Sequence, residues 1–175
     1  MDTDTDMDRC EDTDMQTAFI YGSAHGLFDF QTCLLARMSD GLTRIDAAKI
    51  LSTFAMNILD KKPNYDVTCP FSDMTSQDSD AQHYAIIACQ LGLMGLKGDG
   101  TAAATFNPNG LLDKAQLATI LSRLVYGNQY NTLDSCRYCK HVDALKANGI
   151  INVTTDLFMP LKRGRAMLML MRIDN

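Results

Sequence analysis

The sequence predicts an all-α fold, and three observations support this prediction. Apolar residues recur at helical spacing behind polar residues that favour helix starts, as in the stretch that Thr43 opens. Three short amphipathic runs end at Gly26, Gly92 and Gly149, as helices that close in left-handed geometry do. Apolar residues make up 46% of the 175 residues, which is enough for a sizeable core. We therefore expect one compact helical domain.

The chain divides into three units of similar pattern. Each unit has a short helix closed by one of these glycines, then a variable connector, then a second helix just after a leucine: Leu42, Leu112 and Leu161. One such helix–loop–helix unit buries too little apolar surface alone, so the three must pack together. The predicted divisions are an acidic lead-in at residues 1–14 and units at residues 15–62, 63–128 and 129–175.

The first unit is expected to hold one helix over residues 15–25 and a second helix that starts at Thr43. An irregular connector is expected over residues 27–40, with room for a short turn around residues 33–38. Asp46 stands three residues after Thr43, at the position that completes a capping box. Pro63 ends the second helix, because the residue before a proline avoids helical geometry.

The second and third units repeat this arrangement. In the second unit, Asp78 begins the first helix and Asp113 begins the second helix. In the third unit, we expect helices over residues 141–148 and 162–172. An aromatic-x-Pro turn precedes the second helix in both units.

Composition and charge exclude several functions. The net charge is −5 and no broad basic patch is present, which argues against a nucleic-acid partner. The apolar runs are far too short to span a membrane. The alternating Asp residues of residues 1–14, like Gly98-Asp-Gly-Thr101, lack the Glu at a fixed distance that a calcium loop requires. We predict no metal and no cofactor.

Six cysteines are the candidates for disulfide bonds: Cys10, Cys33, Cys69, Cys89, Cys136 and Cys139. A bond between Cys69 and Cys89 is feasible if the start of the second unit packs on its first helix. The Cys136-x-x-Cys139 pair is open to a redox role, half of a zinc site, or a structural disulfide. That disulfide would form within the pair or with one of the two N-terminal cysteines.

Catalytic patterns are missing from the sequence. No Ser/His/Asp group, paired-carboxylate spacing or phosphate loop stands out. The three histidines, His25, His83 and His141, stand at different distances from the closing glycines, so they do not share one position of the repeat. The enzyme alternative is a thiol oxidoreductase acting through the Cys-x-x-Cys pair, and we predict that the protein is not an enzyme.

At these residues the chain resembles the S-layer homology (SLH) domain family. The second unit carries the motifs of that family: Phe71-Ser-Asp73, Leu91-Gly-Leu93, Gly98-Asp-Gly-Thr101, Phe106-Asn-Pro108 and Leu112-Asp-Lys-Ala-Gln116. The first unit keeps Leu42-Thr-Arg-Ile-Asp46, and the third keeps Gly149-Ile150, Met159-Pro160 and Arg163-Gly-Arg165. The resemblance covers roughly residues 15–173, and the cysteines also resemble those of surface proteins from candidate-phylum bacteria. The tryptophan usual in the family's first helix is absent, and Tyr84 or Tyr138 would replace it in part.

The resemblance implies three units with pseudo-threefold symmetry at the cell surface or in the cell wall, outside the cell. It also implies that anionic secondary cell-wall polysaccharide binds in the grooves between units. By position, the ligand-binding residues would be Thr43, Arg44, Lys114 and Arg163. A cation beside the free N–H groups of a helix start suits a carboxylate or pyruvate ketal, although lysine cannot make a bidentate contact. The alternative is a self-assembling subunit of a surface layer or filament, whose partner is a second copy of the chain.

Overall fold

The computed structural model of the protein describes residue 10 and residues 12–152 and 155–175. This part of the chain is all helical, as predicted, and its helices are α1 (Thr13–Ala24), α2 (Cys33–Ala36), α3 (Arg44–Asn57), α4 (Ser79–Gln90), α5 (Lys114–Tyr126), α6 (Cys139–Ala147) and α7 (Arg163–Asp174). Its only β-structure is a set of isolated bridges. None of these helices has the length and apolar character that crossing a membrane requires. Most of the predicted acidic lead-in lies outside the described residues.

Local sequence signals explain where the helices begin and end. Three predicted caps, Thr43, Asp78 and Asp113, are confirmed, because their side chains accept a backbone N–H three residues further on. Asp12 caps α1 in the same way. The three closing glycines, Gly26, Gly92 and Gly149, have φ angles of 63°, 74° and 71°, which glycine adopts without strain. These signals act within a few residues, so the positions of the helix ends follow from the local sequence.

One local prediction for the first unit is confirmed and one is wrong. The short turn expected around residues 33–38 is the short helix α2, which Thr32 caps. Asp46 does not complete a capping box, since its carboxylate lies 2.7 Å from the guanidinium of Arg163 instead. Aspartate is one methylene shorter than glutamate and reaches back poorly. The capping box forms in α5, where Gln116 Oε1 accepts from the N–H of Asp113 at 3.1 Å.

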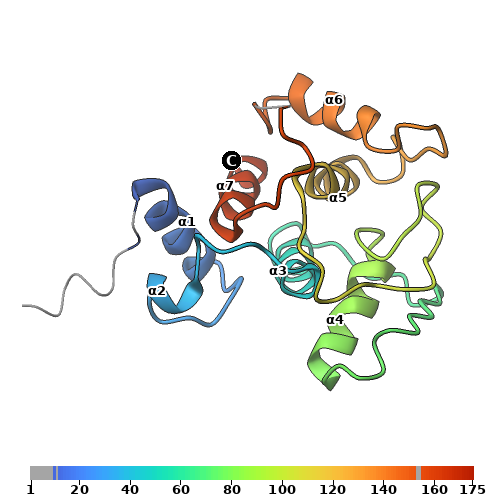
Figure 1. Ribbon diagram of the computed structural model, residues 1–175, viewed down its shortest axis with the longest axis horizontal. Coiled ribbons are helices and arrows are strands. Elements are labelled where there is room, and N and C mark those ends of the chain that lie inside the picture. Colours follow the sequence, from blue (N-terminus) through green and yellow to red (C-terminus); the bar gives the residue numbers. More distant parts are fainter. Residues whose placement is uncertain (1–9, 11, 153–154) are drawn as a thin grey trace, which may run out of the picture.

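The helices pack in pairs that cross the boundaries between the predicted units. Figure 1 shows α3 beside α4, α5 beside α6, and α7 beside α1, with the three pairs pointing in three directions. Each pair joins the second helix of one unit to the first helix of the next, and the last unit pairs with the first. The described chain therefore closes on itself through α1 and α7.

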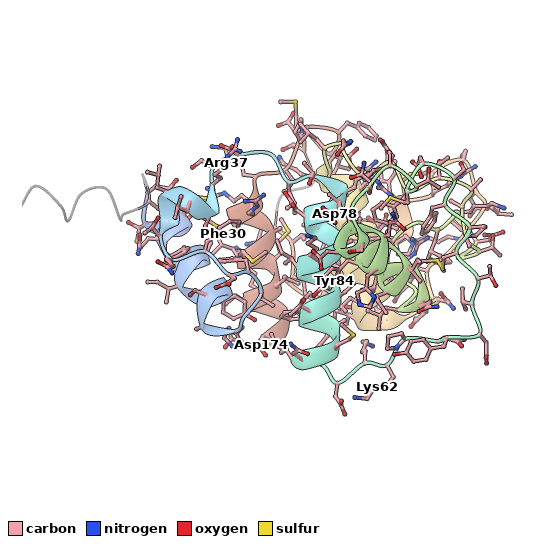
Figure 2. All side chains as sticks on the ribbon, turned by 90° about the horizontal axis from the view of Figure 1, so that it is seen from below. Phe30, Arg37, Lys62, Asp78, Tyr84 and Asp174 are labelled. Carbon is pink, nitrogen blue, oxygen red and sulfur yellow. A yellow bond between two sulfur atoms is a disulfide. The ribbon has the colours of Figure 1, made fainter. Side chains whose placement is uncertain are left out.

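The α1 and α7 helices run parallel. At their starts, Arg165 pairs with Asp14 at 2.6 Å. At their ends, the hydroxyl of Tyr21 donates to the carboxylate of Asp174 at 3.0 Å. Figure 2 shows Asp174 at this end of the molecule. Because both starts and both ends are held, the two helices are in register along their length.

Three buried leucines connect the units at the centre of the molecule. The N–H of Leu42 donates to the carbonyl of Leu161 at 2.9 Å, that of Leu161 to Leu112 at 2.8 Å, and that of Leu112 to Leu42 at 2.8 Å. We call this closed cycle of backbone hydrogen bonds the leucine ring. It satisfies backbone groups that would otherwise be buried without partners.

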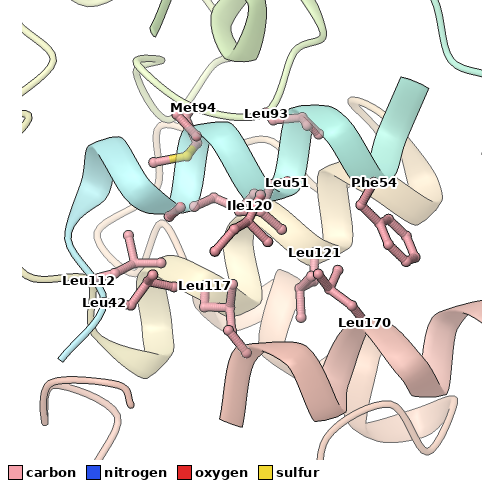
Figure 3. Packing of buried hydrophobic residues seen from close by; sticks show 14 of the residues in the cluster. Leu42, Leu51, Phe54, Leu93, Met94, Leu112, Leu117, Ile120, Leu121 and Leu170 are labelled. Carbon is pink, nitrogen blue, oxygen red and sulfur yellow. The ribbon is translucent and has the colours of Figure 1, made fainter. Parts of the chain in front are cut away.

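The core surrounds the leucine ring. Figure 3 shows side chains of α3, α5 and α7 meeting in one cluster, among them Leu51, Leu121 and Leu170, which are at most 1% exposed. Burying a side chain of this size contributes about 2 kcal/mol. The second helix of every unit therefore faces the centre, and the first helices cover the outside.

Candidate functional site

A pocket of about 340 Å³ lies where all three units meet. Its walls come from the start of α3, the loop over residues 93–98, the first turns of α5, and parts of the third unit. Four cations and two aromatic residues line it: Arg44, Lys97, Arg123, Arg137, Tyr138 and Phe158. We call it the cationic pocket. Of the residues predicted to bind ligand, Arg44 is the one that lines it.

Arg44 is held in place by the motifs of the second unit. Asp73 accepts the N–H groups of Phe106 and Asn107 at 2.8 and 2.7 Å, and the ring of Phe71 packs edge-on against Phe106 at 5.3 Å. Nε of Arg44 then donates to the carbonyl of Phe106 at 2.7 Å, with the guanidinium 5.3 Å from the ring centre. The Phe-x-Asp motif therefore positions the Phe-x-Pro turn, and the turn positions the arginine.

The surroundings act differently on the two charged groups near this contact, Asp73 and Arg44. Burial raises the pKa of Asp73, but the two backbone N–H groups lower it further, so that it lies below its ordinary value. Burial lowers the pKa of Arg44, which the carboxylates of Asp73 and Asp113 partly offset. Arginine stays protonated in proteins, so Arg44 carries a positive charge in a partly desolvated position.

Arg123 places a second charge at the floor of the pocket. The residue is only 7% exposed. Its guanidinium donates to the carbonyls of Leu93 and Lys97 at 3.4 and 2.9 Å, and to the side-chain oxygen of Asn131 at 3.0 Å. All three partners are neutral. The charge of Asp99 offsets part of the cost of burying this cation, but Arg123 forms no ion pair in the described chain, so an anion in the pocket would be favoured.

Nearby carboxylates offset the positive charge of the cationic pocket only in part. Within the described chain, none of its four cations forms an ion pair, whereas Arg37, Lys49, Arg163 and Arg165 each do. Asp113 is the one acidic residue in its lining, and its carboxylate caps α5 by accepting the N–H of Gln116 at 2.7 Å. The walls therefore offer guanidinium and ammonium groups to a negatively charged ligand.

The aromatic side chains form one rim of the pocket. Tyr138 packs edge-on against Phe158 with ring centres 5.4 Å apart. Phe158 is 68% exposed, although large apolar side chains usually lie inside. An exposed aromatic face beside cations can stack on the C–H face of a sugar ring while the cations bind its acidic group.

Arg163 lies in a position equivalent to that of Arg44, but its charge is neutralised. Its Nη1 donates to the carbonyl of Ala36 at 2.6 Å, and its guanidinium lies 5.9 Å from the ring centre of Phe30. The carbonyls that Arg44 and Arg163 contact both stand six residues before a leucine of the leucine ring. Unlike Arg44, however, Arg163 forms an ion pair, with Asp46 at 2.7 Å.

Lys114 is the third cation that stands two residues after a leucine of the leucine ring, as Arg44 and Arg163 do. It lines another hollow, of about 430 Å³, together with Lys162 and Arg165. Arg165 is neutralised by Asp14, and this hollow contains no aromatic side chain. The fourth predicted residue, Thr43, uses its hydroxyl to cap α3 by accepting the N–H of Asp46 at 3.2 Å. The predicted residues are therefore spread over three junctions and do not form one site.

The residue four positions after each leucine of the leucine ring determines whether the cation of the neighbouring unit is neutralised. The residue there is Asp46 in the first unit, Gln116 in the second and Arg165 in the third. Arg163 forms an ion pair with Asp46, Arg44 lines the same pocket as Gln116, and Lys114 lines the same hollow as Arg165. The cation forms an ion pair in the first case, remains without one in the second, and lies in the third beside an arginine that Asp14 neutralises.

The cysteines lie in three pairs at disulfide-bonding distance. The Cα atoms are 6.4 Å apart for Cys69 and Cys89, as the sequence predicted. The Cys-x-x-Cys residues pair with each other at 5.5 Å, which was one of the open alternatives, and the N-terminal cysteines pair at 5.4 Å. No group of three or more potential metal ligands is found among the described residues.

Sequence reasoning missed much of the cationic pocket. Lys97, Arg123, Arg137 and Phe158 did not stand out as ligand-binding candidates, and Tyr138 did so only as a substitute for tryptophan. One feature of the sequence could have identified Arg123, because this cation lies on the apolar face of an amphipathic helix. Comparison with known protein families finds no family model that matches the chain, and no curated protein matches it either.

Proposed function

We propose that the protein is a non-catalytic cell-surface module of the SLH type, which binds an anionic cell-wall polysaccharide in the cationic pocket and so anchors a surface protein. The observation that carries this proposal is the set of four cations without carboxylate partners in one pocket. Arg44, the residue that the family resemblance implicates, is among them. The leucine ring supports a pseudo-threefold arrangement of the units, because it links the same position of each unit in a cycle.

The chemistry of the pocket suits an acidic sugar. A carboxylate or pyruvate ketal pairs well with the guanidinium of Arg44, and its charge compensates that of Arg123. The sugar ring would stack on Tyr138 or Phe158 at the rim. Three cysteine pairs at disulfide distance support a location outside the cell, where such bonds persist.

The proposal assigns the protein no reaction. One Ser–His contact occurs, between Ser122 Oγ and His141 Nδ1 at 2.9 Å. Both residues are at most 1% exposed, so a substrate has no access to the hydroxyl. We interpret this contact as a hydrogen bond of the core between α5 and α6.

Co-sedimentation tests the proposal. The oxidised protein would be spun down with isolated cell-wall sacculi from its own source, before and after the acidic polysaccharide is stripped. We expect binding that is lost on stripping and is weakened about tenfold or more by Arg44→Met, because a charge-assisted contact is removed. The control is Arg37→Met, which removes an exposed arginine that pairs with Asp40 outside the pocket. Binding that survives stripping, or equal binding by the two variants, would contradict the proposal.

A second candidate function is self-assembly into a surface layer or filament. It is favoured by the exposed apolar side chains at α2, where Leu34 and Leu35 are 65% and 57% exposed. Light scattering over a range of concentrations tests it. Growth of the particle with concentration that is abolished by Leu34→Glu would support assembly, and a strict monomer would exclude it.

A further inference from the structure

Two residues of the cationic pocket lie between a pair of cysteines. The order along the chain is Cys136, Arg137, Tyr138, Cys139, and both inner residues line the pocket. The Cα atoms of the cysteines are 5.5 Å apart and the six cysteines leave none free, so a cross-link closes this four-residue loop. Cys139 is the first residue of α6, so the loop lies directly before the helix.

Few directional contacts fix these two side chains. Arg137 is exposed and lies against Gly98, where a Cβ atom would come 3.0 Å from Arg137 Cδ, and it makes no ion pair in the described part of the chain. Tyr138 packs partly against the hydrophobic core and against Phe158, which is itself exposed. As the residue before α6, Tyr138 makes no side-chain capping bond. The backbone path that the cross-link imposes is therefore the main restraint on Arg137 and one of the restraints on Tyr138.

This cysteine pair is also the most accessible of the three. Cys139 is exposed and Cys136 is half-buried, whereas Cys33 and Cys89 in the other pairs are 3% and 2% exposed. Cys139 starts a helix, and the free N–H groups of a helix start stabilise a thiolate. Exchange with a dithiol is fastest at an accessible sulfur with a good leaving thiolate.

We infer that the Cys136–Cys139 cross-link is a positioning element of the cationic pocket, and that its reduction by a dithiol weakens binding of the acidic glycan. This inference rests on the proposed function. In the reaction, a thiolate of the dithiol attacks one sulfur and forms a mixed disulfide, and its second thiolate then displaces the protein sulfur. The protein gains two electrons and two protons as two thiols, and the dithiol becomes a disulfide.

The experiment compares the oxidised 175-residue chain with the same chain after mild reduction. Alkylation followed by mass spectrometry identifies the reduced cysteines, and calorimetry measures affinity for the acidic polysaccharide released from sacculi. We expect Cys136 and Cys139 to be alkylated first, the affinity to fall about tenfold, and reoxidation to restore it. Unchanged affinity after reduction of this pair would overturn the inference.

Variants separate positioning from general loosening of the fold. Cys136→Ser/Cys139→Ser should bind like the reduced chain, and the matched control Cys69→Ser/Cys89→Ser, whose residues lie outside the pocket, should bind like the oxidised chain. In an Arg137→Ala/Tyr138→Ala background, reduction should have no further effect on affinity, because the cross-link acts through these side chains. An undiminished effect of reduction in that background would overturn the inference.

Hydrogen exchange decides the inference independently of the ligand. In the reduced chain, the amide groups of residues 137–139 should exchange faster while those of residues 142–147 stay protected. Equal exchange in both redox states would overturn the positioning role. Failure of the oxidised wild-type chain to bind the polysaccharide, by contrast, would overturn the proposed function and leave the exchange result to decide this inference.

Discussion

The cationic pocket and the junction between the third and first units contain the same kind of arginine in two settings. We call that junction the seam, and it comprises α1, α7 and the pair formed by Arg163 and Asp46. Arg44 and Arg163 both begin a helix, both donate to a carbonyl, and both lie over an aromatic ring. Of the two, only Arg163 forms an ion pair with a carboxylate. The comparison teaches that one residue of the neighbouring unit decides whether such a cation stabilises the fold or stays available to a ligand.

The arginine of the seam stabilises a junction that no continuous chain crosses. The first and second units, and the second and third, are joined by continuous chain, whereas the third and first meet only through non-covalent contacts. An ion pair between Arg163 and Asp46, with the arginine side chain 11% exposed, ties together residues far apart in the sequence. The pocket does not need this tie, because its neighbouring units are already linked.

The largest expected effect is that of acid on the α5–α6 pair, which lies on the pocket side of the molecule and not in the seam. Burial and the charge of Arg123 lower the pKa of His141, in the α5–α6 pair, to about 4. The folded protein keeps this histidine neutral, but the unfolded chain binds a proton below its ordinary pKa of about 6.5. Stability is therefore full above pH 6.5 and falls by about 3 kcal/mol as the pH drops to 4. Urea unfolding at several pH values measures this loss.

Two histidine variants show whether His141 causes the acid effect. His141→Gln should remove most of this part of the pH dependence. The control His83→Gln, which replaces an exposed histidine of α4, should keep it. If both variants lose stability with acid as the wild type does, the buried histidine is not responsible.

Removal of either arginine should affect stability unequally. Arg163→Met leaves the carboxylate of Asp46 unpaired and removes the bond to the carbonyl of Ala36, so we expect about 2 kcal/mol less stability. Arg44→Met removes one bond to a carbonyl and no ion pair, so we expect about 1 kcal/mol. Urea unfolding compares the two variants under the same conditions. Equal losses would remove the distinction between the seam and the pocket.

The smallest expected effect comes from giving the pocket the carboxylate of the seam. In Gln116→Asp, the new carboxylate should partly neutralise Arg44 and weaken binding of the acidic polysaccharide about fivefold, or about 1 kcal/mol. The variant loses the bond from the N–H of Asp113 to Gln116, and the favourable interaction of an acidic residue with the first turn of the helix should compensate for this loss. Calorimetry at low and moderate salt measures the effect, and the salt dependence of binding should become shallower. Unchanged affinity would mean that Gln116 does not control the charge of Arg44.

Sequence reasoning predicted the fold well where the determinants were local. The caps at Thr43 and Asp113 and the turn at Gly92 depend on a few neighbouring residues, so their positions could be read from the chain. The pairing of α1 with α7 could not, since it depends on how three units close around the leucine ring. The partner of Cys69 was predicted because both cysteines belong to one short segment.

The candidate site was predicted only in part for the same reason. Arg44 could be named because a motif marks it, whereas Arg123 and Arg137 join it only through tertiary contacts. The partner of Arg163 is Asp46, which is 117 residues away in the sequence, and helical spacing gives no information about such a pair. Motifs therefore identified the cations, and the fold decided which of them remain unpaired.

The parallel register of α1 and α7 has a mechanical consequence. Tension applied before the start of α1 and after the end of α7 pulls the two helices in opposite directions along their common axis. The contacts at Asp14 and Arg165 and those at Tyr21 and Asp174 then carry the load together, instead of opening one after another. The junction between the third and first units, which only non-covalent contacts hold, is thus loaded in shear, the direction in which a pair of packed helices resists separation best.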